Sequence, residues 1–119
     1  MTDYNRGDLV WANLEPVRRG EQGRTRPCVV VSYDAMNHSK HPCIVICPVT
    51  GKENVHKEYP THVILLAKYV SIFDKDSVVM AEQVRAIAKE RIDINRKAIS
   101  LSADIMEKVD RALRKVLDL

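Results

Sequence analysis

The sequence has no long apolar segment. Its longest apolar runs, residues 43–49 and 63–67, are far shorter than the ~18 residues that a membrane-spanning helix needs. Residues 1–6 contain no apolar stretch after a basic region, so they do not look like a secretory signal. We therefore expect a cytoplasmic protein that makes no contact with a membrane.

Cysteine is scarce, and its spacing argues against two kinds of site. Cys28, Cys43 and Cys47 are an odd number of cysteines in apolar segments, which does not suit a disulfide framework. On a strand, Cys43 and Cys47 would share one face about 13 Å apart, because a strand rises ~3.3 Å per residue. That separation is too large for one zinc ion. We expect three buried thiols, no metal site and no cofactor.

The common catalytic motifs are absent too. The sequence contains no P-loop, no G-x-S-x-G, no H-E-x-x-H and no G-x-G-x-x-G. These motifs mark phosphate-loop enzymes, serine hydrolases, zinc proteases and dinucleotide-binding enzymes. The residues therefore point to none of these classes.

The composition is that of one compact domain, residues 1–119. Hydrophobic residues make up 45% of the chain, and 19 Lys and Arg against 16 Asp and Glu give a net charge of +3. A chain of this length buries about two-thirds of its unfolded surface, so it forms a core without disulfides or a metal. The excess charge lies in residues 18–26, which include four arginines and one acid. This local field suits phosphate, although a solvated basic loop without a ligand has the same composition.

Apolar patterns predict a mainly β protein. Alternating or continuous apolar residues between polar, Gly or Pro positions predict six strands, at residues 7–14, 27–32, 43–49, 61–67, 77–81 and 84–88. The strand at 27–32 should be buried on both faces, because its apolar run is continuous. Residues 17–25 read as a long loop, and residues 33–42 as a turn or short helical segment.

The period of the apolar residues changes near the end of the chain. From Ser102 they recur every three or four residues, which predicts a helix of about four turns. Ser102 is the expected N-cap, and Leu101 is placed to pack on Met106. Strands followed by one helix exclude a doubly wound α/β fold. We expect a small, curved antiparallel sheet or partly open barrel with this helix packed against it, and a homodimer that covers the sheet edges.

Two polar residues stand where predicted strands begin or end. Arg26 precedes Pro27, whose ring keeps residue 26 extended, and a guanidinium matches phosphate oxygens. Thr50 ends the third predicted strand, where its hydroxyl can donate to a phosphate oxygen. Alone, Thr50 is more typical of an ordinary turn residue. The residues by themselves do not decide between binding and cleavage.

Short motifs in a fixed order resemble a known family. They are Arg6-Gly7-Asp8-Leu9-Val10, Glu21-Gln22-Gly23, Arg26-Pro27, Pro48-Val49-Thr50, Pro60-Thr61-His62-Val63 and Glu82-Gln83-Val84-Arg85. Together they resemble the MazF/PemK toxins of type II toxin–antitoxin modules over nearly the whole chain. The resemblance implies a small SH3-like, partly open antiparallel β-barrel of the plasmid maintenance toxin type, a homodimer, and metal-independent, sequence-specific cleavage of single-stranded RNA. It also implies an antitoxin that covers the active groove, and a basic groove suits an acidic, disordered antitoxin segment.

The resemblance also assigns roles to residues. Arg26 and Thr50 match the catalytic arginine and threonine of the family, whereas His62 fits a structural role. The expected substrate-binding residues are Glu21, Gln22, Arg24, Gln83 and Arg85. Cys28 departs from the family pattern, in which an aliphatic residue or alanine is more familiar.

The implied chemistry is attack of a ribose 2′-hydroxyl on the adjacent phosphorus, which needs no metal and excludes DNA as substrate. Arg26 and Thr50 would stabilise charge on the phosphate oxygens, and one well-placed donor contributes about 2.7–4 kcal/mol. Arginine is not readily deprotonated, so we expect proton donation or transfer through water, with Glu21 as a lesser candidate base. Two alternatives stay open: a non-catalytic toxin of the same fold that poisons DNA gyrase, and a small RNA-binding barrel.

Overall fold

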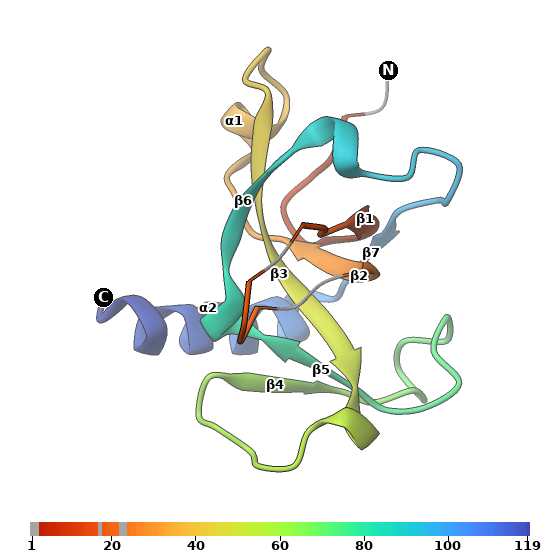
Figure 1. The fold of residues 1–119 in the computed structure, drawn as a ribbon, viewed down its shortest axis with the longest axis vertical. Helices are drawn as coiled ribbons and strands as arrows, with labels where there is room; N and C mark the ends of the chain where they lie inside the picture. Colours follow the sequence, from red (N-terminus) through yellow and green to blue (C-terminus); the bar gives the residue numbers. More distant parts are fainter. Residues whose placement is uncertain (1–2, 17, 22–23) are drawn as a thin grey trace.

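The computed structural model describes residues 3–16, 18–21 and 24–119, and its main features are a curved antiparallel sheet and one long helix (Figure 1). The strands are β1 Asp8–Asn13, β2 Thr25–Val30, β3 Cys43–Gly51, β4 His62–Leu65, β5 Ser77–Met80, β6 Arg85–Ala88 and β7 Ile99–Ser100. The helices are α1 Asp34–Asn37 and α2 Ala103–Leu117, with single 3₁₀ turns at η1 Lys52–Asn54, η2 Ala81–Gln83 and η3 Lys89–Arg91. The prediction of a mainly β protein with a C-terminal helix is confirmed.

The longest strand, β3, connects the two halves of the sheet. Residues 43–46 pair with β6, and residues 49–51 pair with β5. Between these segments β3 pairs with β2, which continues through β1 to β7, while β5 pairs with β4. Because β3 changes partners along its length, the sheet curls around it as a half-barrel (Figure 1).

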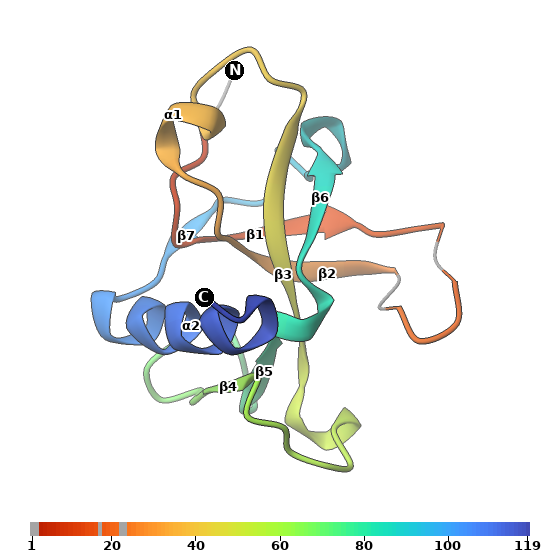
Figure 2. The same cartoon turned by 90° about the vertical axis from the view of Figure 1, so that its left-hand side faces the viewer.

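The central strands are buried on both faces. One cluster joins the sheet to α2, which crosses one face of it (Figure 2). In β1, Leu9 belongs to this cluster and Val10 to a second cluster on the other face. In β2, Cys28, Val29 and Val30 are all fully buried. The prediction that this strand is covered on both sides is therefore confirmed.

Helix α2 begins as the sequence predicts. The Ser102 side chain accepts a hydrogen bond from the Ile105 N–H over 3.3 Å, which caps the first turn. Leu101 and Met106 pack in the same apolar cluster. The buried side chains of the helix, Met106, Val109 and Ala112, follow a spacing of three residues, so one face of α2 covers the sheet.

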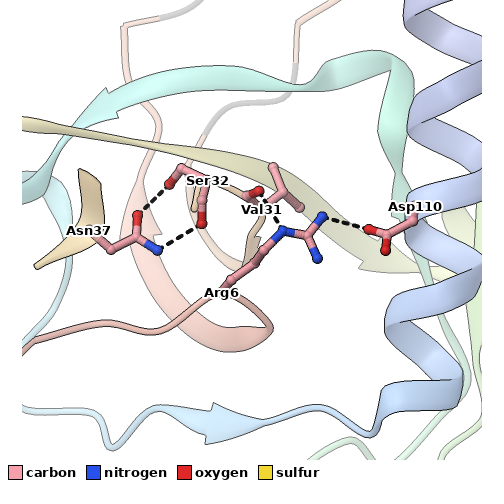
Figure 3. Close-up of polar contacts among 5 residues, drawn as sticks. All are labelled: Arg6, Val31, Ser32, Asn37 and Asp110. Atoms are coloured by element: carbon pink, nitrogen blue, oxygen red, sulfur yellow. Dashed lines mark hydrogen bonds and ion pairs between the residues drawn. The ribbon is translucent and has the colours of Figure 1, made fainter. Parts of the chain in front are cut away.

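An ion pair joins the beginning of the chain to α2 (Figure 3). Arg6 Nη2 lies 2.5 Å from Asp110 Oδ1, and Arg6 Nε donates to the Val31 carbonyl over 2.9 Å. Beside it, Ser32 Oγ donates to Asn37 Oδ1, and Asn37 Nδ2 donates back to the Ser32 carbonyl. These contacts hold the end of β2, α1 and α2 together.

The observed boundaries of the six predicted strands lie within two residues of the predicted ones. β2 begins at Thr25, before Pro27, because Arg26 and Thr25 pair with β1 while pairing with β3 begins only at Cys28. β3 continues through Thr50 to Gly51, because β5 pairs with both residues. The two-residue strand β7 was not predicted.

Candidate functional site

Arg26 and Thr50 meet across the β2–β3 pair. The ladder pairs Cys28 with Pro48, so the same register places Arg26 opposite Thr50 two residues further along. Arg26 Nη1 donates a hydrogen bond to Thr50 Oγ1 over 3.2 Å. Thr50 is buried and Arg26 half-buried. The main chains of adjacent strands therefore bring together the two residues that the sequence singled out.

A third side chain, which the sequence analysis missed, also contacts this pair. η1 follows directly on β3, and Asn54 Nδ2 donates to Thr50 Oγ1 over 3.3 Å. The Thr50 oxygen thus accepts two hydrogen bonds, and its own hydrogen can be donated to a ligand. A guanidinium and a hydroxyl placed together in this way suit the oxygens of a phosphate. In the sequence, the signal was an amide residue in the turn four positions after Thr50.

The side chains of Gln83 and Arg85 hold the β1–β2 loop. Gln83 lies in η2, and its Nε2 donates to the Gly20 carbonyl over 3.0 Å. Arg85, the first residue of β6, donates to the Leu14 carbonyl over 3.4 Å. Arg91 donates to two further carbonyls of the same segment. Gln83 and Arg85 therefore contact the loop that leads into β2.

The other predicted binding residues belong to this loop itself. The Glu21 carboxylate accepts from the Arg18 N–H over 2.5 Å. Arg24 is exposed, has a φ of 65°, and its N–H donates to the Glu15 carboxylate over 2.7 Å. Gln22 lies outside the described residues. In the described part of the loop, the contacts of the Glu21 carboxylate are with its own turn rather than with the strand pair.

A hollow of about 300 Å³ opens beside Thr50. Asn54, His62 and Gln83 are among the residues that line it. His62 Nε2 lies 3.2 Å from a Glu82 carboxylate oxygen, and the imidazole is only 8% exposed. A second oxygen of Glu82 accepts from the Thr61 hydroxyl over 2.9 Å. This cluster fixes one wall of the hollow.

The cysteines differ in their burial. Cys28 and Cys47 are buried, whereas Cys43 is only partly buried, so the prediction of three buried thiols is wrong for Cys43. Cys43 is the first residue of β3, where the strand pairs with β6 but not yet with β2, because pairing with β2 begins at Ile46. Burial raises the pKa of Cys28 to about 12, although the nearby charges of Arg85 and Arg26 favour its thiolate. Burial likewise raises the pKa of Cys47 to about 12.

Neither a metal centre nor a membrane-spanning helix is found in residues 3–16, 18–21 and 24–119. They contain no group of three or more His, Cys, Asp or Glu side chains that could hold a metal ion. No helix in this part of the chain is both long enough and apolar enough to cross a bilayer.

Comparison with known families gives a match along most of the chain. A family model described as PemK-like, MazF-like toxin of type II toxin-antitoxin system matches residues 5–117. The matched segment contains Arg26, Thr50 and the hollow beside them.

Solved structures resemble the whole fold. MazF from Deinococcus radiodurans is 30% identical, with a TM-score of 0.76 over 100% of both chains. A MazE-MazF structure from the same organism is also 30% identical, with a TM-score of 0.70 over 100% of this chain and 99% of that chain. An endoribonuclease in complex with its cognate antitoxin, from a mycobacterial species, is 19% identical with a TM-score of 0.74, over 98% and 96% of the chains. This last likeness concerns the fold alone. The predicted partly open barrel of this toxin type is confirmed.

Proposed function

The chain belongs to the PemK-like, MazF-like toxins of type II toxin–antitoxin systems, and from this membership we propose that it is an endoribonuclease that cuts single-stranded RNA at specific sequences. Cutting messenger RNA would inhibit translation and stop growth of the cell. An endoribonuclease of mycobacterial origin has the same fold, so the fold is compatible with this activity. The cytoplasm is the compartment in which this substrate is found.

The observation that carries the proposal is the contact between Arg26 and Thr50. The guanidinium and the hydroxyl lie 3.2 Å apart, and Asn54 orients the hydroxyl oxygen from a second direction. Donors held in place before the substrate arrives stabilise developing charge without reorganising during the reaction. The pair thus has the chemistry needed at a scissile phosphate.

The reaction proceeds by attack of the ribose 2′-oxygen on the adjacent phosphorus. The bond from phosphorus to the 5′-oxygen of the next nucleotide breaks, so the products are a 2′,3′-cyclic phosphate and a 5′-hydroxyl. Arg26 and Thr50 donate hydrogen bonds to the non-bridging phosphate oxygens as negative charge increases there. Arginine stays protonated, so water takes up the proton of the 2′-hydroxyl, and water also supplies the proton that the leaving 5′-oxygen gains. The nucleophile belongs to the substrate, which is why the reaction needs no metal and no cofactor.

The remaining parts of the proposal concern partners. A cognate antitoxin inhibits the toxin by covering the site with an acidic, disordered segment that folds on binding. The MazE-MazF structure that the chain resembles supports such a complex. The toxin acts as a homodimer, in which each copy covers a sheet edge of the other.

One experiment tests the reaction and separates it from the alternatives. The protein is incubated with long single-stranded RNA, and the 5′ ends of the fragments are mapped. We expect cuts at one short sequence, unchanged in EDTA and absent when the ribose on the 5′ side of the cut is 2′-deoxy. RNA bound without fragments would instead favour an RNA-binding barrel. Neither binding nor cleavage, together with inhibition of DNA gyrase, would favour the gyrase poison.

A further inference from the structure

Tyr59 stands on the rim of the hollow beside Thr50. It lies in the connection between η1 and β4, which forms a loop at the lower end of β3 (Figure 1). The residue is 51% exposed, and it lines the same hollow as Thr50. An exposed aromatic ring thus lines the same hollow as the residue proposed to contact phosphate.

The orientation of the Tyr59 ring is fixed from one side. The ring packs edge-on against the imidazole of His62, with 5.3 Å between ring centroids and 81° between planes. His62 is in turn held by Glu82, and Glu82 by Thr61. The Lys57 ammonium lies 5.5 Å from the centre of the tyrosine ring. Packing against a nearly buried histidine reduces the freedom that the ring would lose on binding a ligand.

We infer that the hollow binds the base of an unpaired nucleotide next to the scissile phosphate, with Tyr59 as its stacking surface. The inference rests on the proposed function, because that function places the phosphate at Thr50. In a nucleotide the ribose joins the base to its phosphate, so a phosphate at Thr50 brings the base next to the hollow that Thr50 and Tyr59 both line. Its volume of about 300 Å³ is at the lower end of the range for sites that bind small ligands, so the hollow is suited to a single base.

The chemistry of single-stranded RNA fits this surface. Unpaired bases expose their flat faces, and proteins bind them by stacking on aromatic side chains. The amides of Asn54 and Gln83 also line the hollow and can hydrogen-bond to the edge of a stacked base. Tyr59 therefore supplies affinity for any base, while the amides are placed to discriminate between bases.

The chain offers a matched control. Tyr69 is 71% exposed, even more than Tyr59, but it lines a different hollow together with Leu101 and Ile105 at the start of α2. Exposure alone would give both tyrosines the same effect on RNA. Tyr69 therefore controls for an exposed tyrosine that does not line the hollow beside Thr50.

The experiment compares Tyr59→Ala, Tyr59→Phe and Tyr69→Ala on RNA oligonucleotides that carry the mapped cut site. A second set of oligonucleotides has an abasic ribonucleotide at each position around the cut in turn. We expect Tyr59→Ala to lower kcat/KM roughly 5- to 150-fold, the range for loss of one stacked base. Tyr59→Phe, which keeps the ring, should restore most of this loss, and Tyr69→Ala should act like the unchanged protein. On the oligonucleotide with one particular abasic position, kcat/KM of the unchanged protein should fall by a similar factor. On that oligonucleotide, kcat/KM of Tyr59→Ala should be the same as on the complete one.

Other results would overturn the inference. The inference is wrong if Tyr59→Ala and the unchanged protein have equal kcat/KM. It is also wrong if Tyr59→Ala lowers kcat/KM by the same factor on every abasic oligonucleotide as on the complete one. Thermal unfolding of each variant identifies a misfolded one, and Tyr59→Leu then replaces Tyr59→Ala. If the unchanged protein cuts no RNA, the proposed function fails and no cut site can be mapped; fluorescence anisotropy with single-stranded RNA oligonucleotides of mixed sequence then decides the inference separately. Weaker binding by Tyr59→Ala than by Tyr69→Ala supports the stacking surface, whereas equal or absent binding rejects it.

Discussion

Arg26 Nη1 and Thr50 Oγ1 lie 3.2 Å apart although 24 positions separate the two residues in the chain. The register of β2 and β3 produces this contact, because Cys28 pairs with Pro48 two residues away. Strand register is set by packing, since a slip of one residue would move each side chain of β2 to the opposite face of the sheet and out of the apolar cluster in which it packs. The contact between the two donors is therefore a consequence of core packing.

The first prediction concerns the Thr50 hydroxyl. Thr50→Val keeps the shape of the side chain and removes its hydrogen-bonding oxygen. If Thr50 donates to the scissile phosphate, the rate of RNA cleavage should fall about 100- to 1,000-fold, the effect of removing one such donor. Single-turnover cleavage of a labelled oligonucleotide measures this rate.

Arg26→Lys is the companion variant. Lysine keeps the positive charge but lacks the planar fork that contacts two oxygens at once, so binding of RNA should change less than its cleavage. Far-UV circular dichroism and the melting temperature should match those of the unchanged protein, because Arg26 is only half-buried. If Thr50→Val and Arg26→Lys both cleave RNA as fast as the unchanged protein, Thr50 and Arg26 do not belong to the active site.

The second prediction concerns the hydrogen bond from Gln83 to the Gly20 carbonyl. Gln83→Leu removes the donor, so amides of residues 18–21 should exchange hydrogen faster, and KM for RNA should rise more than kcat falls. Hydrogen exchange by mass spectrometry and steady-state kinetics test the two effects. Lys89→Met is a matched control, because Lys89 donates to the Ser39 carbonyl in a different loop. A KM that rises equally in both variants would contradict a specific role for Gln83.

The candidate site could be predicted only in part. Arg26 and Thr50 stood out because a proline and a glycine mark the strand ends beside them. Gln83 contacts Gly20, which lies 63 positions away in the chain. A local sequence pattern does not predict a contact between residues so far apart. Asn54 and Tyr59 were missed for a similar reason, because a polar loop shows no periodicity that would fix where its side chains point.

The fold, like the site, could be predicted only where local sequence signals mark its elements. The helix was predicted with its cap, because Ser102 and the apolar stripe are local signals. The strand β7 has two residues, too few for an alternating pattern. It exists because Asp8 and Leu9 offer a free edge of β1 for pairing, which is a property of the folded sheet.

The third prediction concerns the thiols. Burial raises the pKa of Cys28 and of Cys47 to about 12, and only the thiolate reacts readily with a disulfide reagent. At pH 8 in the native protein, we expect Cys43 to react first and the other two to stay protected until the protein is unfolded. Mass spectrometry of the labelled peptides identifies the modified residue. Rapid native labelling of Cys28 would show that the strand pair behind Arg26 opens easily.

The fourth prediction concerns the cap of α2. Ser102→Ala removes the acceptor for the Ile105 N–H and should lower the free energy of unfolding by about 0.5–2 kcal/mol. Ser102→Asp keeps an acceptor and adds a negative charge at the positive end of the helix, so it should retain most of the stability. Urea unfolding followed by circular dichroism gives both values. Equal loss in the two variants would mean that packing, rather than capping, decides stability at this position.

The fifth prediction concerns acid. The Arg6 N–H donates to the Asp34 carboxylate over 2.7 Å, and this bond is the largest cause that lowers the pKa of Asp34 below its ordinary value. A lowered pKa in the folded state means that the folded protein binds fewer protons than the unfolded chain in this range. The contribution of Asp34 to stability is therefore complete above the ordinary aspartate pKa of about 3.9 and disappears as the pH falls through the lower value of the folded state. Asp34→Asn does not titrate, so its stability should differ from that of the unchanged protein at pH 6, and the difference should shrink as the pH falls below about 4. Urea midpoints of both proteins across this range test the sign, and a difference that stays constant or grows toward low pH would refute the role of the Arg6 N–H.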